Sequence, residues 1–141
     1  MSASLLLDAS VWLAALDRDD SFHPAATQLV EAGATGTVIL AALDLTLYEV
    51  ANVAVVRWRS PADARRLVTL VGLACPDTLK RADEQLLREA AAIADHHDLT
   101  VYDGAYVAAV RRHRSTLVSA DVRDLVTPGL AISPDAAAAR A

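Results

Sequence analysis

The sequence predicts a single α/β domain built on a mainly parallel central sheet of four to five strands that is flanked by helices. Short apolar runs, each the length of a buried strand, alternate with longer segments in which apolar residues recur at helical spacing. This alternation is typical of β-α-β units and of a parallel sheet covered on both faces. The 141 residues are the size of one ordinary domain, and no repeat or linker divides them. A hydrophobic fraction of 54% against 22% charged residues indicates a globular chain.

Five short apolar runs are the strand candidates. Each is bounded by polar or turn-forming residues, as expected for strands buried in a sheet. In chain order the predicted strands cover residues 4–7, 37–40, 99–102, 116–119 and, as a short last strand, 130–132. If these strands are parallel, their carboxyl ends meet at one edge of the sheet, where open α/β sheets bind their ligands.

The segments between these runs carry helical patterns. In chain order the predicted helices cover residues 11–16, 24–32, 44–59, 61–73, 79–97 and 103–113. Ser10 and Ser60 are predicted N-caps, Pro61 suits a first helical position, and Gly33 is expected to stop the second helix. The Ala-rich segment 134–141 is expected to fray as a tail.

The composition indicates the cellular compartment in which the chain is expected to act. Its single cysteine, Cys75, has no partner for an internal disulfide and sits in an apolar run, which favours an inert buried thiol and a reducing compartment. The first residues carry no basic region typical of a leader, and no apolar stretch reaches the roughly 18 residues of a membrane span. A cytoplasmic protein without membrane attachment is expected. The net charge of −5 provides no overall attraction to nucleic acid.

Four acidic residues are the candidate site. Asp8, Asp103 and Asp121 stand at the ends of three predicted strands, so a parallel sheet would bring them to the same edge. Each also precedes a helical pattern, and N-capping explains each one taken singly. Glu49 is different, because it is the only acidic residue over 45–56, in a helix apolar enough for burial. A carboxylate there must form an ion pair, coordinate a metal or face a polar cavity.

A cluster of these four acids would need a positive charge or a bound proton. Two carboxylates about 4 Å apart repel by about 4 kcal/mol at an effective dielectric constant of 20. Several such pairs would rival the whole stability of a domain, which is about 5–15 kcal/mol. Ligation by carboxylate oxygens alone suits Mg²⁺ or Mn²⁺, and no Cys and His set with zinc spacing competes with it.

Four sequence motifs carry these acids. They are Leu7-Asp8-Ala9-Ser10, Glu49-Val50-Ala51-Asn52, Tyr102-Asp103-Gly104-Ala105-Tyr106-Val107-Ala108 and Val118-Ser119-Ala120-Asp121. In order and spacing the set resembles the motifs of PIN-domain ribonucleases, and more narrowly those of VapC toxins of bacterial type II toxin–antitoxin systems. The resemblance covers nearly the whole chain, and each motif is weak alone.

The resemblance implies a PIN-like nuclease domain over residues 1–133, followed by the tail 134–141. It implies an endoribonuclease that hydrolyses RNA phosphodiester bonds with Mg²⁺ or Mn²⁺. The implied catalytic and metal-binding residues are Asp8, Glu49, Asp103 and Asp121. Ser10 and Ser119 match the small hydroxyl positions beside the first and last acids, where they would position an acid or a water. Asp124 is an alternative to Asp121, which the spacing favours.

The resemblance also implies partners. They are a VapB-like antitoxin, whose C-terminal segment covers the site, and a second copy of the chain in a homodimer. Whether the substrate is tRNA, rRNA or mRNA stays open. Arginines near the site would hold the RNA backbone. The candidates are Arg57, Arg59, Arg65, Arg66, Arg111, Arg112 and Arg114. Gly104 stands where an alanine is more usual in the family, a change expected to loosen the first turn of its helix.

Other functions fit the residues less well. An aspartyl-phosphate enzyme of the haloacid dehalogenase kind needs a second aspartate two residues after the first, where this chain has Ser10. A response-regulator receiver needs a lysine on a late strand, whereas the only lysine, Lys80, lies in a predicted helix. No glycine-rich phosphate loop is present. Within the PIN family, a housekeeping RNA-processing nuclease and a non-catalytic partner-binding scaffold remain as alternatives, although the presence of all four acids argues against the scaffold.

Overall fold

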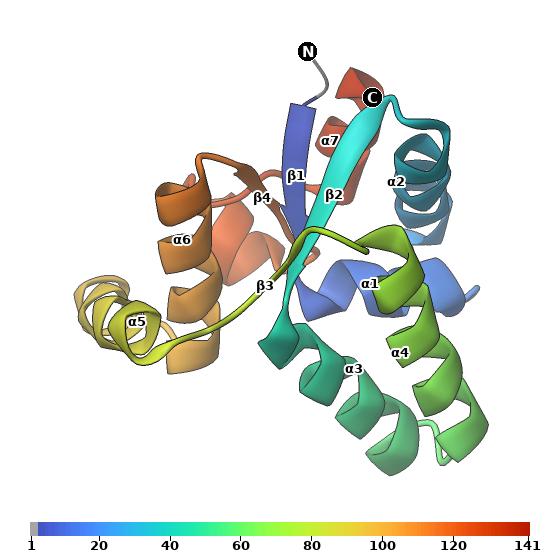
Figure 1. The fold of residues 1–141 in the computed structure, drawn as a ribbon, viewed down its shortest axis with the longest axis horizontal. Helices are drawn as coiled ribbons and strands as arrows, with labels where there is room; N and C mark the ends of the chain where they lie inside the picture. The colour runs from blue at the N-terminus through green and yellow to red at the C-terminus, as the bar shows by residue number, and fades with distance from the viewer. Residues whose placement is uncertain (1–2) are drawn as a thin grey trace.

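The computed structural model describes residues 3–141 and confirms the α/β fold, with one parallel sheet between layers of helices (Figure 1). The strands are β1 (Ala3–Leu7), β2 (Val38–Leu43), β3 (Leu79–Lys80) and β4 (Thr116–Val118), in the spatial order β3-β2-β1-β4. Leu5 of β1 pairs with Leu40 on one side and with Thr116 on the other. The carboxyl ends of β1 and β4 therefore lie side by side.

Helices cover both faces of the sheet. Within residues 3–141 they are α1 (Ala9–Leu16), α2 (His23–Thr35), α3 (Asp44–Val56), α4 (Pro61–Ala74), α5 (Glu84–His97), α6 (Val101–His113), the π-helix η1 (Val122–Val126) and α7 (Pro134–Arg140). No helix in this part of the chain has the length and apolar character that crossing a membrane requires.

Alternate residues of the strands face two separate apolar cores, as the pleat of a strand requires. On β1, Leu5 and Leu7 pack into the core formed with α1, α2, α3, α4 and α7. Leu6 faces the opposite way, into the core formed with α5 and α6. Because both faces of the sheet are covered, its central strands are apolar at successive positions, which is why they were visible in the sequence as short apolar runs.

The predicted strand over 99–102 is wrong, because Val101 and Tyr102 form the first turn of α6. Thr100 caps this helix: its hydroxyl oxygen accepts a hydrogen bond from the Asp103 backbone N–H at 3.1 Å. The Val101 and Tyr102 side chains are 46% and 59% exposed, as suits the outer side of a helix. A run of four residues is too short to show whether its period is that of a strand or a helix. Asp103 is consequently the third residue of α6 and not its N-cap.

The predicted helix over 79–97 begins later than expected. Leu79–Lys80 instead form β3, which pairs with Ala42–Leu43 at the end of β2. The helix proper, α5, starts after Asp83, whose carboxylate caps it by accepting the Leu86 backbone N–H at 2.8 Å. The pairing with β2 is a tertiary contact that no local pattern reports.

The expectation of a fraying tail is also wrong. Pro134–Arg140 form α7, and the Ser133 hydroxyl oxygen caps it by accepting the Ala136 backbone N–H at 3.1 Å. Ala137 is fully buried, and α7 packs against α2. A short Ala-rich helix is marginal in isolation, so this packing is what stabilises it.

Several element ends differ from their predicted positions. The helix α2 continues through Gly33 and ends at Gly36, which adopts the left-handed conformation with φ of 81°. The predicted strand over 130–132 reduces to a single parallel bridge between Val118 and Ile132. The Ser60 cap of α4 is confirmed, because its hydroxyl oxygen accepts the Asp63 backbone N–H at 3.1 Å. The predicted Ser10 cap is wrong, because Ser10 is the second residue of α1 and Asp8 is the N-cap.

Candidate active site

The four predicted acids reach the site from two kinds of element. Asp8 follows β1 directly and caps α1, and Asp121 lies three residues after the end of β4 and caps η1. Glu49 projects from α3. Asp103 comes from the first turn of α6, so the expectation that it would stand at a strand end is wrong.

Asp103 is the common electrostatic neighbour of the other acids. Its charge contributes to raising the pKa of both Asp8 and Glu49, after burial, which is the largest cause for each. The pKa of Asp103 itself is raised, first by burial and then by the charges of Asp121 and Asp124. Nearby negative charge therefore adds to the effect of burial in disfavouring ionisation of Asp8, Glu49 and Asp103.

Asp8 is the most deeply buried of the acids, with 5% of its surface exposed. Burial raises its pKa to about 6, against the opposing effect of hydrogen bonds from the Ser10 and Ser119 side chains. The Ser10 backbone N–H donates to Asp8 Oδ1 at 3.0 Å, and the Ser10 hydroxyl donates to the same oxygen. The Asp8 carboxylate is thus held in one orientation at the end of β1.

The two serines connect the ends of β1 and β4. Ser10 Oγ accepts a hydrogen bond from the Ala120 backbone N–H at 2.9 Å, across 110 positions of sequence. Ser119 is fully buried, and its Oγ accepts the Asp121 backbone N–H at 3.0 Å. Both hydroxyls therefore hold the backbone at Ala120 and Asp121. This arrangement agrees with the predicted positioning role of Ser10 and Ser119.

Asp121 and Asp124 have different environments. Asp121 Oδ1 accepts the Asp124 backbone N–H at 3.0 Å and so caps η1. The Asp124 carboxylate pairs with the exposed Arg123 guanidinium at 3.0 Å. Of the two, Asp121 has the larger effect in raising the pKa of Asp103. Both observations favour Asp121 as the site acid, as its spacing does.

Glu49 has a partner that no sequence motif indicated. Tyr106 Oη donates a hydrogen bond to Glu49 Oε1 at 2.6 Å, and Thr46 Oγ1 lies 2.7 Å from the same hydroxyl. Burial raises the pKa of Glu49, while the Tyr106 hydrogen bond lowers it. One signal was available in the sequence, since a tyrosine in a buried helix needs a partner for its hydroxyl.

Glu49 is accessible from an open groove of about 990 Å³ between α3, α4 and α6. Most of the groove wall is apolar, from side chains such as Leu45, Val53 and Val68. Among residues 3–141, Glu49 is the only acidic residue that lines it. The acid on α3 thus faces both solvent and the carboxylate cluster.

Gly104 lies where α5 and α6 approach each other closely. A Cβ atom at this position would lie 2.4 Å from the Ala90 backbone oxygen, closer than real Cβ atoms approach. The glycine therefore allows α5 and α6 to pack in close contact immediately beside Asp103. Its place in the motif is explained by packing between the two helices.

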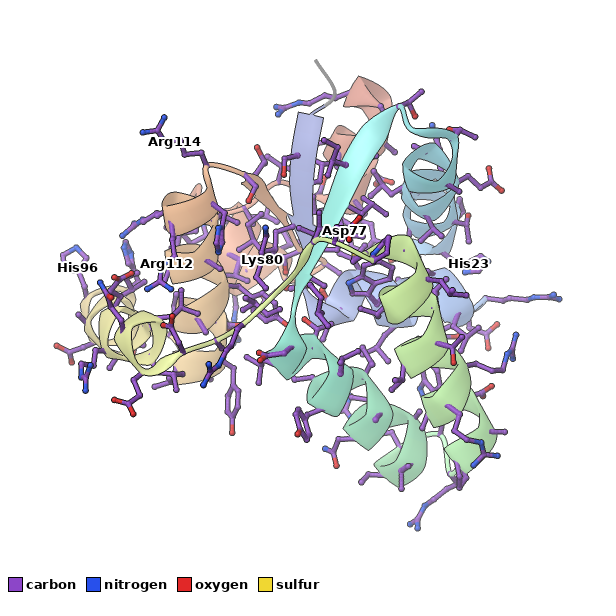
Figure 2. The ribbon with its side chains drawn as sticks, in the orientation of Figure 1. His23, Asp77, Lys80, His96, Arg112 and Arg114 are labelled. Atoms are coloured by element: carbon purple, nitrogen blue, oxygen red, sulfur yellow. The ribbon has the colours of Figure 1, made fainter. Side chains whose placement is uncertain are left out.

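Arg112 and His96 lie on α6 and α5 and are directed away from the sheet edge that carries Asp8 and Asp121 (Figure 2). Arg112 on α6 points toward α5 (Figure 2), where its Nη1 lies 3.2 Å from Asp83 Oδ1 and its Nη2 lies 3.5 Å from Glu89 Oε1. These ion pairs join the two helices and leave Arg112 poorly suited to hold RNA. Figure 2 shows His96 on the outer side of α5, away from the sheet.

The donor chemistry of the site suits a hard divalent cation. Every candidate ligand is a carboxylate oxygen, and the pKa of Asp8, Glu49 and Asp103 is raised in each case. Within residues 3–141, no three acidic, histidine or cysteine side chains are grouped as a ready-made metal site. Mg²⁺ does not require such a group, since it usually keeps several waters and binds through one or two carboxylates together with substrate phosphates. The residues therefore fit a partly hydrated Mg²⁺ or Mn²⁺.

Comparison with solved structures identifies several similar folds. PAE2754 from Pyrobaculum aerophilum is 24% identical, with a TM-score of 0.68 over 99% of this chain and 97% of that one. A chain of a toxin–antitoxin complex from Klebsiella pneumoniae is 19% identical, with a TM-score of 0.65 over 94% and 98%. Mycobacterium tuberculosis VapC20, described as a sarcin-ricin loop cleaving toxin, is 16% identical, with a TM-score of 0.68 over 89% and 95%.

Comparison with known families gives the more specific result. No curated protein matches the chain. The model of the PIN domain matches residues 5–126, a span that contains all four predicted acids together with both serines and Asp124. The chain therefore belongs to the PIN domain family.

Proposed function

We propose that the protein is a metal-dependent endoribonuclease that acts as the toxin of a toxin–antitoxin pair. PIN domains are nucleases, and nucleases are hydrolases. The observation that carries the proposal is the acidic cluster: Asp103 lies within electrostatic reach of Asp8, Glu49, Asp121 and Asp124, and the pKa of three of these five carboxyls is raised. A bound cation would offset the repulsion between these carboxylates. A negatively charged phosphodiester would enter the site only together with such a cation.

In this mechanism Asp8, Glu49, Asp103 and Asp121 would hold the metal, either directly or through the waters that it keeps. A bound Mg²⁺ or Mn²⁺ would lower the pKa of a water and stabilise negative charge on the phosphate and the leaving oxygen. Asp8 must be ionised to serve, and a pKa of about 6 leaves it mostly ionised near pH 7. Ser10 and Ser119 keep the Asp8 carboxylate and the Asp121 backbone in place.

The proposed partners follow from the similar structures. One of them comes from a toxin–antitoxin complex and another is VapC20, described as a toxin. We therefore propose a small VapB-like antitoxin as the partner of this chain. The homodimer that we also propose rests on the resemblance of the sequence motifs to those of VapC toxins. An enzyme that cuts cellular RNA would act in the cytoplasm, in agreement with the buried free thiol of Cys75.

The test is incubation of the purified protein with total cellular RNA, with and without Mg²⁺, followed by mapping of the cut ends. We expect discrete cuts that require the metal and leave a 5′-phosphate and a 3′-hydroxyl. Asp103→Asn should abolish them, because it removes the charge shared by the whole cluster. Cutting by Asp103→Asn at the wild-type rate would refute the assignment.

A growth assay separates the toxin from a housekeeping nuclease. Induced expression should arrest growth, and co-expression of the small protein encoded next to the gene should relieve the arrest. A catalytically active chain that leaves growth unaffected would favour the housekeeping function. A chain that binds the neighbouring protein without cutting any RNA would favour the non-catalytic scaffold.

A further inference from the structure

The Tyr106 hydroxyl lies at the centre of a buried polar network between α3 and α6. It donates to Glu49 Oε1 at 2.6 Å and lies 2.7 Å from Thr46 Oγ1. Tyr106 is 1% exposed and Thr46 is fully buried. Tyr106 is 57 and 60 positions from its two partners, so the contact is purely tertiary.

The direction of the hydrogen bonds follows from the chemistry of the three groups. An ionised carboxylate only accepts hydrogen bonds, so the single proton of the Tyr106 hydroxyl is directed to Glu49. The Thr46 hydroxyl must then donate its own proton to the Tyr106 oxygen. The network therefore runs from Thr46 through Tyr106 to Glu49, and both buried hydroxyls are satisfied by it.

Glu49 depends on this network for its orientation. In residues 3–141 its carboxylate accepts no hydrogen bond other than the one from Tyr106. Glutamate has three side-chain torsions, and a half-exposed carboxylate without a partner would sample several rotamers. The bond holds Oε1, and Oε2 accepts no hydrogen bond from any residue in 3–141. The charge of Asp103 acts on this same carboxylate and contributes to raising its pKa.

We propose that Tyr106 is a positioning residue that holds the Glu49 carboxylate toward Asp103, so that the two acids can share a divalent cation. This inference rests on the proposed metal-dependent nuclease function. Tyr106 touches neither RNA nor metal, and it acts only through Glu49. Thr46 completes the network by orienting the Tyr106 hydroxyl.

The direct test is Tyr106→Phe, which removes the hydroxyl and keeps the ring in the core. Mn²⁺ affinity is measured by calorimetry, and the Mn²⁺ concentration for half-maximal RNA cleavage is measured separately. We expect both to show weakening by about 10- to 100-fold, the usual effect of losing a group that orients a metal ligand. The matched control is Tyr48→Phe, which makes the same change on a 79% exposed side chain next to Glu49 and should leave both values unchanged.

Two further variants separate positioning from stability. Thr46→Ser keeps the hydroxyl and should retain wild-type Mn²⁺ affinity. Thr46→Val combined with Tyr106→Phe removes both hydroxyls, so neither buried hydroxyl is left without the other as partner. The inference predicts that this folded double variant still binds Mn²⁺ weakly. Wild-type affinity in the double variant, or in Tyr106→Phe, would overturn it.

The same measurements on Asp103→Asn distinguish a failure of the proposed metal site from a failure of the proposed role of Tyr106. If wild type and Asp103→Asn bind Mn²⁺ equally, the proposed metal site is wrong and the inference falls with it. If Asp103→Asn loses Mn²⁺ binding while Tyr106→Phe stays within twofold of wild type, only the role of Tyr106 is overturned.

Discussion

Replacing Asp8 with asparagine tests the cost of burying an ionised carboxylate at the end of β1 in the absence of metal. Burial raises the pKa of Asp8 from 3.8 to about 6 in the folded protein. That difference corresponds to about 3 kcal/mol of folding free energy, lost when the folded protein must carry the ionised carboxylate. Asparagine is uncharged at every pH and keeps the Oδ1 acceptor for the Ser10 backbone N–H. It should therefore remove the cost and preserve the cap of α1.

The sign of the pH dependence follows from proton binding. Between about pH 4 and pH 6 the folded protein holds the Asp8 proton, while the unfolded chain has released it. The contribution of Asp8 to the free energy of unfolding therefore decreases as the pH rises through this window, and it is constant above it. Asp8→Asn should match wild type near pH 4 and exceed it by up to about 3 kcal/mol at pH 7.5.

The assay is thermal unfolding in chelator from pH 4 to pH 8, followed by circular dichroism. For a domain of this size, the expected gain corresponds to an increase in Tm of roughly 2–4 °C per kcal/mol. Glu31→Gln, which removes an exposed charge on α2, is the control and should leave the difference between pH 4 and pH 7.5 as in wild type. Mn²⁺ stabilises a protein when it binds the folded state and not the unfolded chain. Added Mn²⁺ should therefore stabilise wild type more than Asp8→Asn, which lacks one of the proposed metal ligands. An Asp8→Asn variant that is less stable than wild type throughout this range would refute the reasoning.

Three further results are expected. Gly104→Ala should destabilise the protein by about 1–3 kcal/mol in urea unfolding, because the new Cβ meets the Ala90 backbone oxygen at 2.4 Å; Gly72→Ala, which meets nothing within 4 Å in a helix, should instead stabilise it by up to about 1 kcal/mol. Asp121→Asn should abolish RNA cleavage, whereas Asp124→Asn should retain measurable cleavage, since Asp124 is paired with an arginine; the opposite order would exchange their roles. Chelation of divalent metal should stop cleavage and added Mn²⁺ should restore it, and cleavage that persists in chelator would contradict the metal-dependent mechanism.

Local chemistry explains the elements that could be predicted. The run Leu5-Leu6-Leu7 is a strand because both faces of the sheet are covered, so its successive residues are all apolar. Ser60 begins α4 because its hydroxyl oxygen satisfies the backbone N–H of Asp63. Each of these two signals is contained within a few consecutive residues, which is the range over which a sequence pattern is informative.

Elements that depend on distant contacts were missed. Leu79–Lys80 are a strand only because the end of β2 lies beside them. The Ala-rich segment after Ser133 is a helix because α2 covers it. The run that ends at Tyr102 has a different, local cause: four residues are too few to show a helical period, and the Thr100 cap that begins α6 lies inside the run itself.

For the site, the sequence by itself determined which acids to consider. Asp8, Glu49, Asp103 and Asp121 stand in four ordered motifs, and an acid in an apolar helix needs a partner or a cation. The resemblance of these motifs predicted the PIN family, whereas the fold class was predicted from the alternation of strand and helix patterns. Local spacing also placed Ser10 and Ser119 beside two of the acids.

Only the tertiary structure decided how those acids interact. It made Asp103 the common neighbour of the cluster, buried Asp8 so that its pKa rises to about 6, and placed the Tyr106 hydroxyl on Glu49. It also showed that Gly104 allows two helices to pack closely. Electrostatic and hydrogen-bond energies depend on distance and burial in space, and residues 57 positions apart in the chain have neither until it folds.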